Sequence, residues 1–149
     1  MFAFNGISLK DNCQNIVSDN IVYGNGGNDS LENSADNSTL SGGKGADTLQ
    51  NLNGDDAYIS GGKGNDSIFS NNANKITVLG GSENDTIKIQ RSKNSKIDGG
   101  DGNDLISLKS SAGTMTVIGG KGNDTIYGDT RKSVVFIYAQ GDGNDIIYG

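Results

Sequence analysis

The chain has 149 residues, of which only 32% are hydrophobic and 24 are glycine, so it cannot fill one large globular core. Its net charge of −6 disfavours nucleic acid and anionic membranes as partners of the chain as a whole. The lack of histidine and the single cysteine exclude a zinc site or a disulfide framework built from this chain alone.

Residues 1–23 lack the glycine motif of the remaining chain and contain Phe2, Phe4, Ile7 and Leu9. We expect this segment to cap the open end of a repeat region and to supply its first strand, since solenoid ends need a cover. A frayed leader is the alternative. The segment shows no cleavable secretory signal, and no apolar run in the sequence is long enough to span a bilayer. Cys13 is interpreted as an ordinary small side chain.

From Gly24 onward, a glycine-rich turn recurs every 18 to 21 residues, as in GGKGND at Gly61–Asp66 and again at Gly119–Asp124. A repeat of this length is typical of a solenoid in which every unit adds one coil. Stacking would place the aspartates that end the turns in one row. These residues are Asp29, Asp47, Asp66, Asp85, Asp104, Asp124 and Asp145.

Each turn leads into a short strand with one aliphatic residue two positions after the aspartate, and a second such position precedes the next turn. In the fourth unit, residues 86–90 are the expected first strand, 91–94 the return turn and 95–98 the second strand. Strand alternation points inward both columns, the first of which is aliphatic and the second aliphatic or aromatic. The columns are Leu31, Leu49, Ile68, Ile87, Ile106, Ile126 and Ile147, and Val22, Leu40, Ile59, Val78, Ile97, Val117 and Tyr138.

This pattern predicts an all-β fold, a parallel β-roll or β-helix solenoid over residues 24–149 with two short strands per coil and about seven coils. Stacked carboxylates about 4.8 Å apart repel by roughly 3.5 kcal/mol at an effective dielectric of 20, so a bound cation is needed. Calcium prefers carboxylate and carbonyl oxygens, which glycine turns expose. We therefore predict several Ca²⁺ ions, up to six, in a single row between successive turns.

The segments GGKGADTL, GGKGNDSI, GGDGNDLI and GGKGNDTI resemble the GGxGxDxUx repeat of RTX proteins, the calcium-binding β-rolls of secreted bacterial toxins, proteases, lipases and adhesins. The resemblance implies a right-handed roll that is disordered without Ca²⁺ and folds on meeting it outside the cell. It also implies that the seven aspartates are metal ligands, together with the carbonyls of Gly43, Gly45, Gly62, Gly64, Gly81, Gly100, Gly102, Gly120, Gly122, Gly141 and Gly143.

The chain departs from that family in its period, because RTX rolls usually repeat every nine residues and carry calcium on both edges. Here most return turns lack the aspartate, which leaves one calcium edge. Asp56, nine residues after Asp47, could form one additional site. Glu83 and Asn25 replace turn glycines, so the gaps beside Asp85 and the first gap are the weakest candidates.

A single calcium row with a repeat of this length also resembles the ice-binding region of a large bacterial RTX adhesin, whose turns present Thr and Asn outward. The Asn half of that array is present, but the Thr position is occupied mainly by charged residues, and a solvated Asn row is the plainer interpretation. The Asn residues are Asn28, Asn65, Asn84, Asn103, Asn123 and Asn144, and the Thr position holds Gly26, Lys44, Lys63, Ser82, Asp101, Lys121 and Asp142.

Other functions are weakly indicated. The glycine turns lack the Lys-Ser/Thr ending of a phosphate-binding loop, and aspartates that recur in every unit are not the single interruption that an active site makes. We therefore do not expect an enzyme. A basic group near the return turns is either a solvated face or a contact for an anionic surface polymer. It comprises Arg91, Lys93, Lys96, Lys109, Arg131 and Lys132.

The predicted function is a calcium-binding structural module of a secreted or cell-surface bacterial protein, exported unfolded by type I secretion. The alternatives are an accessory repeat domain of a secreted enzyme and an adhesin or ice-binding segment. Apart from calcium ions, the expected partners are a cell-surface polymer or further repeats in end-to-end contact. Nucleic acid and membrane insertion are not expected. Because the sequence stops four residues after Asp145, in mid-coil, we interpret it as part of a longer repeat protein or as a coil closed by a partner.

Overall fold

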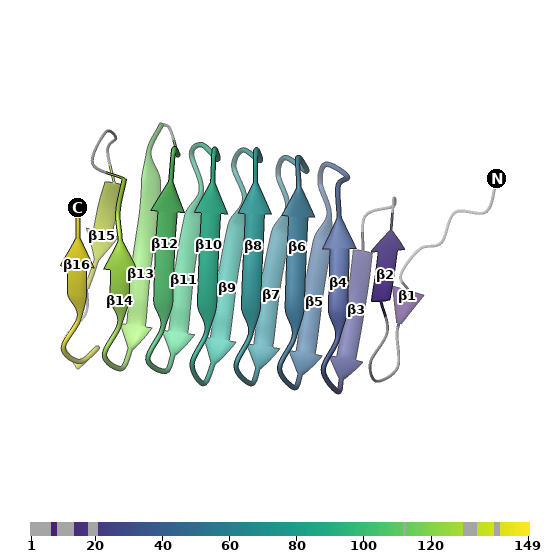
Figure 1. Cartoon of the computed structure of the whole chain (residues 1–149), viewed down its shortest axis with the longest axis horizontal. Coiled ribbons are helices and arrows are strands. Elements are labelled where there is room, and N and C mark those ends of the chain that lie inside the picture. The colour runs from purple at the N-terminus through teal and green to yellow at the C-terminus, as the bar shows by residue number, and fades with distance from the viewer. Residues whose placement is uncertain (1–6, 9–13, 18–20, 112, 130–133, 139–140) are drawn as a thin grey trace.

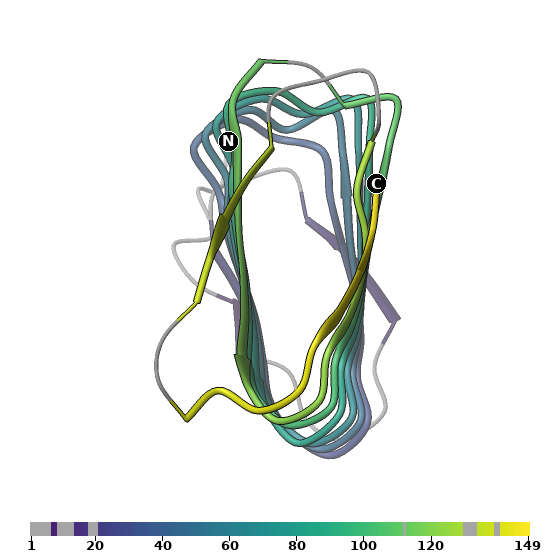
Figure 2. The same ribbon diagram turned by 90° about the vertical axis from the view of Figure 1, so that its left-hand side faces the viewer.

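The computed structural model describes residues 7–8, 14–17, 21–111, 113–129, 134–138 and 141–149, which form strands and turns and contain no helix. Two parallel sheets of eight strands each face one another (Figure 1). Viewed along its axis, the molecule is a stack of flattened coils with a turn at either narrow edge (Figure 2). The predicted all-β solenoid with two short strands per coil is confirmed.

Odd-numbered strands form one sheet and even-numbered strands form the other. The odd sheet contains β1 (Ile7–Ser8), β3 (Ile21–Gly26), β5 (Thr39–Lys44), β7 (Tyr58–Lys63), β9 (Thr77–Ser82), β11 (Lys96–Asp101), β13 (Met115–Lys121) and β15 (Val134–Ile137). The even sheet contains β2 (Gln14–Val17), β4 (Ser30–Asn33), β6 (Thr48–Leu52), β8 (Ser67–Asn71), β10 (Thr86–Gln90), β12 (Leu105–Lys109), β14 (Thr125–Tyr127) and β16 (Ile146–Tyr148). We call the odd-to-even turns the glycine edge and the even-to-odd turns the return edge.

Strand pairing puts equivalent residues of successive repeats beside each other. Leu49 pairs with Ile68, which pairs with Ile87, and in the odd sheet Leu40 pairs with Ile59 and then Val78. These side chains are at most 1% exposed. The inward orientation predicted for both columns is therefore confirmed in the central coils, and each coil adds at least two apolar side chains to one continuous core.

The prediction of Tyr138 as the last residue of the odd-sheet column is wrong. Val117 pairs with Phe136, which packs against the core, whereas Tyr138 is 52% exposed. Counting back from the glycine turn fails here because two additional residues lie between the end of β15 and that turn. The parallel register with β13 sets which side chain points inward, not the distance to the next glycine.

The core also contains a third group of side chains near the return edge, which the sequence pattern did not predict. Asn33, Asn51, Ser70, Ile89 and Leu108 occupy one column and are all buried. The Asn33 Nδ2 donates to Ser38 Oγ at 2.6 Å and to Asn51 Oδ1 at 3.1 Å. Buried amides whose hydrogen-bonding groups have partners are tolerated inside a protein. The column is polar in the first coils and apolar in the later ones.

At the N-terminal end, β1 pairs with β3 and β2 pairs with β4, so described strands of the first segment extend both sheets. The division into a cap of residues 1–23 and a roll of residues 24–149 stays a prediction. Phe2, Phe4, Leu9 and Cys13 lie outside the described residues. Within the described part of the chain, no helix is long and apolar enough to cross a membrane.

The thin core predicts strong sensitivity to one truncation. Replacing Ile87, which is fully buried between Ile68 and Ile106, by Ala should lower the free energy of unfolding by about 2–5 kcal/mol. Urea unfolding in saturating calcium measures this loss. The neighbouring exposed Lys88, changed to Ala, should alter it by less than about 0.5 kcal/mol; equal losses would contradict the assigned strand orientation.

Candidate functional site: the carboxylate row of the glycine edge

The glycine edge is built from strands that run directly into tight turns. In the third repeat the strand β7 includes the first two glycines of the motif, and the chain reverses over residues 64–66 before β8 begins. Gly62 and Gly64 have φ values of 117° and 115°, which favour glycine. Asn25 and Glu83, which replace glycines, adopt φ values of 72° and 74°. These two substitutions therefore keep the chain in the left-handed region that the turn requires.

The predicted aspartates lie in one row along this edge. Asp66 Oδ1 accepts a hydrogen bond of 2.8 Å from the Asp47 backbone N–H, and Asp85 Oδ1 accepts one of 2.8 Å from the Asp66 N–H. The same contact, at 2.7 to 2.9 Å, links every successive pair from Asp29 to Asp145. The first six carboxylates are at most 3% exposed, and Asp145 at the end of the row is partly exposed.

The second carboxylate oxygen of each buried aspartate is the unusual feature of the row. The Oδ2 atoms of Asp47, Asp66, Asp85, Asp104 and Asp124 are buried and accept no hydrogen bond from the described residues. For Asp29 this is true of both oxygens. Buried polar atoms in proteins are almost always satisfied, and a charged one left unsatisfied is costly. A ligand that accepts electron pairs from oxygen would remove this cost.

The space that these oxygens face exists only because the first residue of the first six motifs is glycine. A Cβ added at Gly61 would meet both the Asp66 Oδ2 and, at 2.6 Å, the Gly80 carbonyl oxygen of the next coil. The equivalent positions Gly24, Gly42, Gly80 and Gly99 show the same pair of oxygens. The predicted ligand set named the second and fourth glycines but not this first one. Its occurrence at the start of the first six motifs, with Gln140 at that position in the seventh, was the available signal.

Burial also changes the proton affinity of the row. Desolvation raises the pKa of Asp85 to about 7 and the pKa values of Asp66 and Asp104 to about 6, and neighbouring carboxylates add to the rise. Hydrogen bonds from the preceding aspartate N–H act in the opposite direction. The pKa values of Asp47 and Asp124 are raised for the same main reason. Burial and neighbouring carboxylates thus disfavour the ionised form of the aspartates in the row.

The predicted asparagine row forms a second ladder in the opposite direction. The Asn65 Oδ1 accepts a bond of 2.9 Å from the Asn84 N–H, and the Asn84 Oδ1 accepts one of 2.7 Å from the Asn103 N–H. The links continue through Asn123 to Asn144. These amide oxygens therefore connect coils. The asparagine side chains are exposed, and each asparagine directly precedes an aspartate of the row in sequence.

Two further groups of predicted residues lie outside the row. The motif's third position is exposed at most coils and contains one ion pair among the described residues, from Lys121 Nζ to Asp101 Oδ1 at 2.9 Å. Asp56, considered for an additional site, is exposed on the return edge, where the equivalent residue of the next repeat is Lys75. The structure gives Asp56 no carboxylate neighbour in its own column. Arg131 and Lys132 lie outside the described residues.

The donors on the glycine edge are all oxygens, two carboxylates per gap plus backbone carbonyls. Among the described residues, no three His, Cys, Asp or Glu side chains gather in one group that could hold a metal. A cation between two coils would therefore need main-chain carbonyls to complete its coordination, which suits a hard ion with flexible geometry. Fold and site together define a cation-binding parallel β-solenoid.

The comparison with protein families identifies which one. The family model described as the RTX calcium-binding nonapeptide repeat (4 copies) matches residues 18–40, 23–58, 53–74, 92–115 and 116–130, more than half of the chain. The protein belongs to the RTX calcium-binding repeat family, as predicted, and is a calcium-binding repeat module. No curated protein and no solved structure matches it.

The glycine cradle can be tested by adding one methyl group. Gly61→Ala should weaken calcium binding by at least about tenfold, since the new Cβ meets the Asp66 Oδ2 and the Gly80 carbonyl. Isothermal titration measures the change. Gly26→Ala is the matched control, because its Cβ would find its nearest atoms at 3.9 Å and 4.0 Å. Equal effects of the two substitutions would refute the cradle.

The raised pKa values predict an unusual pH dependence of the calcium-free protein. Between the ordinary aspartate pKa of 3.8 and about 7, the folded row binds more protons than the unfolded chain. Folding without calcium is therefore favoured in mild acid, and this contribution is lost as the pH rises through about 6 to 7. In calcium-free buffer, far-UV circular dichroism should show more strand structure at about pH 5 than at about pH 8. Calcium affinity should instead fall with acidification; a calcium-free protein that gains stability with rising pH would contradict the assignment.

Proposed function

We propose that the chain is a structural module whose folding is switched by calcium outside the cell, as part of a secreted or cell-surface bacterial protein. The observation that supports it most strongly is the row of buried carboxylates with unsatisfied oxygens. The RTX repeat family supports the extracellular setting, because such repeats are typical of secreted proteins. Export by type I secretion in an unfolded state belongs to the same proposal.

We further propose that the seven aspartates of the row and glycine carbonyls of adjacent turns hold the ions, up to six in all. Bound calcium supplies positive charge to the unsatisfied oxygens. Within each gap, the Oδ1 of the later aspartate accepts a hydrogen bond from the backbone N–H of the aspartate in the preceding coil. This leaves its Oδ2 for the ion. The first-position carbonyls, such as that of Gly80, join the second- and fourth-position glycines as ligand candidates because they face the same space.

The coupling to folding follows from two energies. Without a cation, the buried carboxylates either remain charged and repel or bind protons, as their raised pKa values indicate. With calcium at about ten times Kd, each independent site adds roughly 1.4 kcal/mol, and six sites add roughly 8 kcal/mol. That sum is comparable with the net stability of an ordinary domain, about 5–15 kcal/mol. Millimolar calcium should therefore decide whether the coils are folded.

Calcium removal and one substitution test the proposal together. Far-UV circular dichroism should show strand structure with calcium and its loss with EDTA. In calcium, Asp85→Asn should lower the titrated number of ions by one or two, because Asp85 borders two gaps and Asn keeps its shape without the charge. Asp56→Asn is the control, since Asn37 and Asn94 occupy its column.

Two results would count against the proposal. Unchanged circular dichroism after calcium removal would exclude the folding switch, and an unchanged ion count in Asp85→Asn would exclude the row as the binding site. A lower count in Asp56→Asn would instead place one ion on the return edge.

A further inference from the structure

From the first to the fifth coil, the described charges of the return edge and its flanking even-sheet column change sign once. Coils are numbered here from their row aspartate, beginning with Asp29. One column of the return edge contains Asp36, Asp55, Asn74 and Lys93 in successive coils. The Asp55 N–H donates to Asp36 Oδ1 at 2.8 Å, and the Asn74 N–H donates to Asp55 Oδ1 at 2.7 Å. An isolated parallel β-bridge joins Asn74 to Lys93. The column begins acidic and ends basic.

Neighbouring columns show the same order. Asp56 of the second coil is followed by Lys75 of the third, with φ values of 53° and 54° at equivalent turn positions. On the even sheet, Glu32 of the first coil and Lys88 of the fourth belong to one column. The first two coils thus carry the acidic half of this surface and the third to fifth the basic half. The acidic half is Glu32, Asp36, Asp55 and Asp56; the basic half is Lys75, Lys88, Arg91, Lys93 and Lys109.

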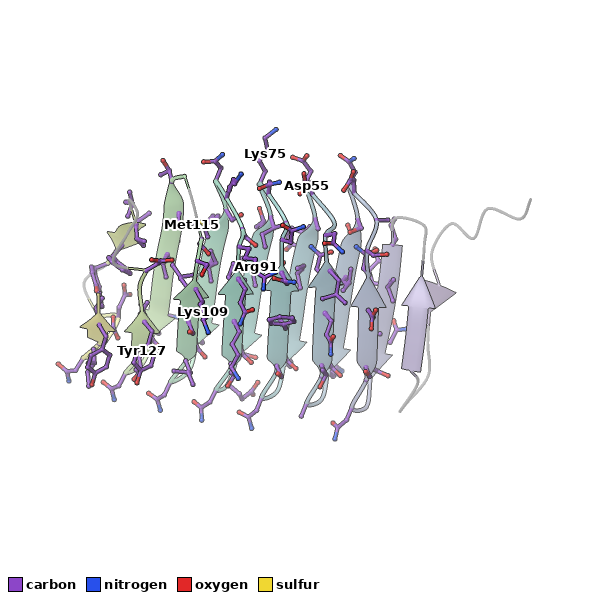
Figure 3. All side chains as sticks on the ribbon, turned by 45° about the horizontal axis from the view of Figure 1, so that its top comes forward. Asp55, Lys75, Arg91, Lys109, Met115 and Tyr127 are labelled. Atoms are coloured by element: carbon purple, nitrogen blue, oxygen red, sulfur yellow. The ribbon has the colours of Figure 1, made fainter. Side chains whose placement is uncertain are left out.

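The basic half is open to a partner. All five of its side chains are exposed, and Lys75 projects from the upper edge while Arg91 and Lys109 lie on the even-sheet side (Figure 3). Among the described residues, ion pairs join only Lys96 to Asp98 and Lys121 to Asp101, so none involves this group. Within the molecule, hydrogen bonds from Asn74 lower the pKa of the Asp55 carboxylate, and the charges of Lys75 and Lys93 lower it further. Asp56 and Lys75 lie in the same column of adjacent coils, but neither forms an ion pair among the described residues.

From this surface we infer that two copies of the chain associate side by side and antiparallel through their return edges. A two-fold axis between the second and third coils would place the third coil opposite the second and the fourth opposite the first. Lys75 then faces the Asp55 and Asp56 coil, and Lys93 faces the Asp36 coil, twice by symmetry. Both copies have the same spacing of about 4.8 Å between coils, so the first four coils each find an oppositely charged coil in register.

A second copy fits this surface better than an anionic polymer does. A polyanion would be attracted by the basic coils but repelled by the four carboxylates of the first two coils on the same edge. Only an occupant with the reverse order of charges satisfies both halves, and this chain has that order itself. Because one edge offers little area, the association is weak and screened by salt. Copies held together on a surface would compensate through their high local concentration.

Sedimentation equilibrium of the folded chain in calcium tests the inference. The wild type should dimerise with a Kd that rises at least about tenfold between about 0.01 M and about 1 M ionic strength. Two variants exchange residues within a column: Lys75→Asp with Lys88→Glu makes the edge acidic, and Glu32→Lys with Asp56→Lys makes it basic. Each variant alone should be monomeric, and an equimolar mixture of the two should form heterodimers.

The matched control is Lys44→Asp with Lys63→Asp on the glycine edge, a column that already contains Asp101. It makes the same change of charge as the acidic variant and should leave dimerisation intact, while circular dichroism in calcium confirms that each variant is folded. A wild type that stays monomeric at low salt would overturn the inference, as would equal loss in the control or failure of the mixture. Binding of monomeric wild type to polygalacturonate would assign the basic half to an anionic polymer instead.

Discussion

The structure depends on one arrangement, a buried carboxylate in each coil that hydrogen-bonds to the backbone of the coil before it. From Asp47 to Asp145 the Oδ1 of each aspartate is used by that contact, as between Asp85 and the Asp66 N–H, and the Oδ2 of the buried ones accepts no hydrogen bond from the described residues. The asparagine ladder beside it runs the opposite way, from the Asn84 Oδ1 to the Asn103 N–H. Each turn is therefore hydrogen-bonded to both neighbouring coils. The contacts of Oδ1 orient the carboxylates without a bound ion.

This arrangement explains why the repeat needs so much glycine and so little hydrocarbon. A turn narrow enough to bring the Asp66 Oδ2 and the Gly80 carbonyl to the same place leaves no room for a side chain at Gly61. A narrow coil in turn encloses few apolar side chains, such as Ile59 and Ile68 in one repeat. Because the core is thin and burial of the carboxylate charge is unfavourable, the ions at the glycine edge decide whether the chain is folded or unfolded.

The sequence predicted those features that repeat and missed those that do not. The Asp row and the columns through Leu40 and Ile87 recur at one period, so stacking alone aligns them. The buried column from Asn33 to Ile89 changes residue type between coils and shows no periodic signal. Phe136 replaces the expected Tyr138 because the register with β13, and not the local spacing, selects the inward side chain. The role of the first glycine depends on a contact between coils, which no single repeat contains.

The two edges of the rod differ in what they can specify. On the glycine edge nearly every coil presents the same turn, so a partner that recognises it could shift by one coil and find an equivalent surface. Such ambiguity of register is inherent in repetitive strands. On the return edge, Asp55, Asn74 and Lys93 give successive coils different charges within one column, so each coil is distinguishable. Uniformity suits a row of identical ions, whereas a contact that must have one position and one direction needs the variable edge.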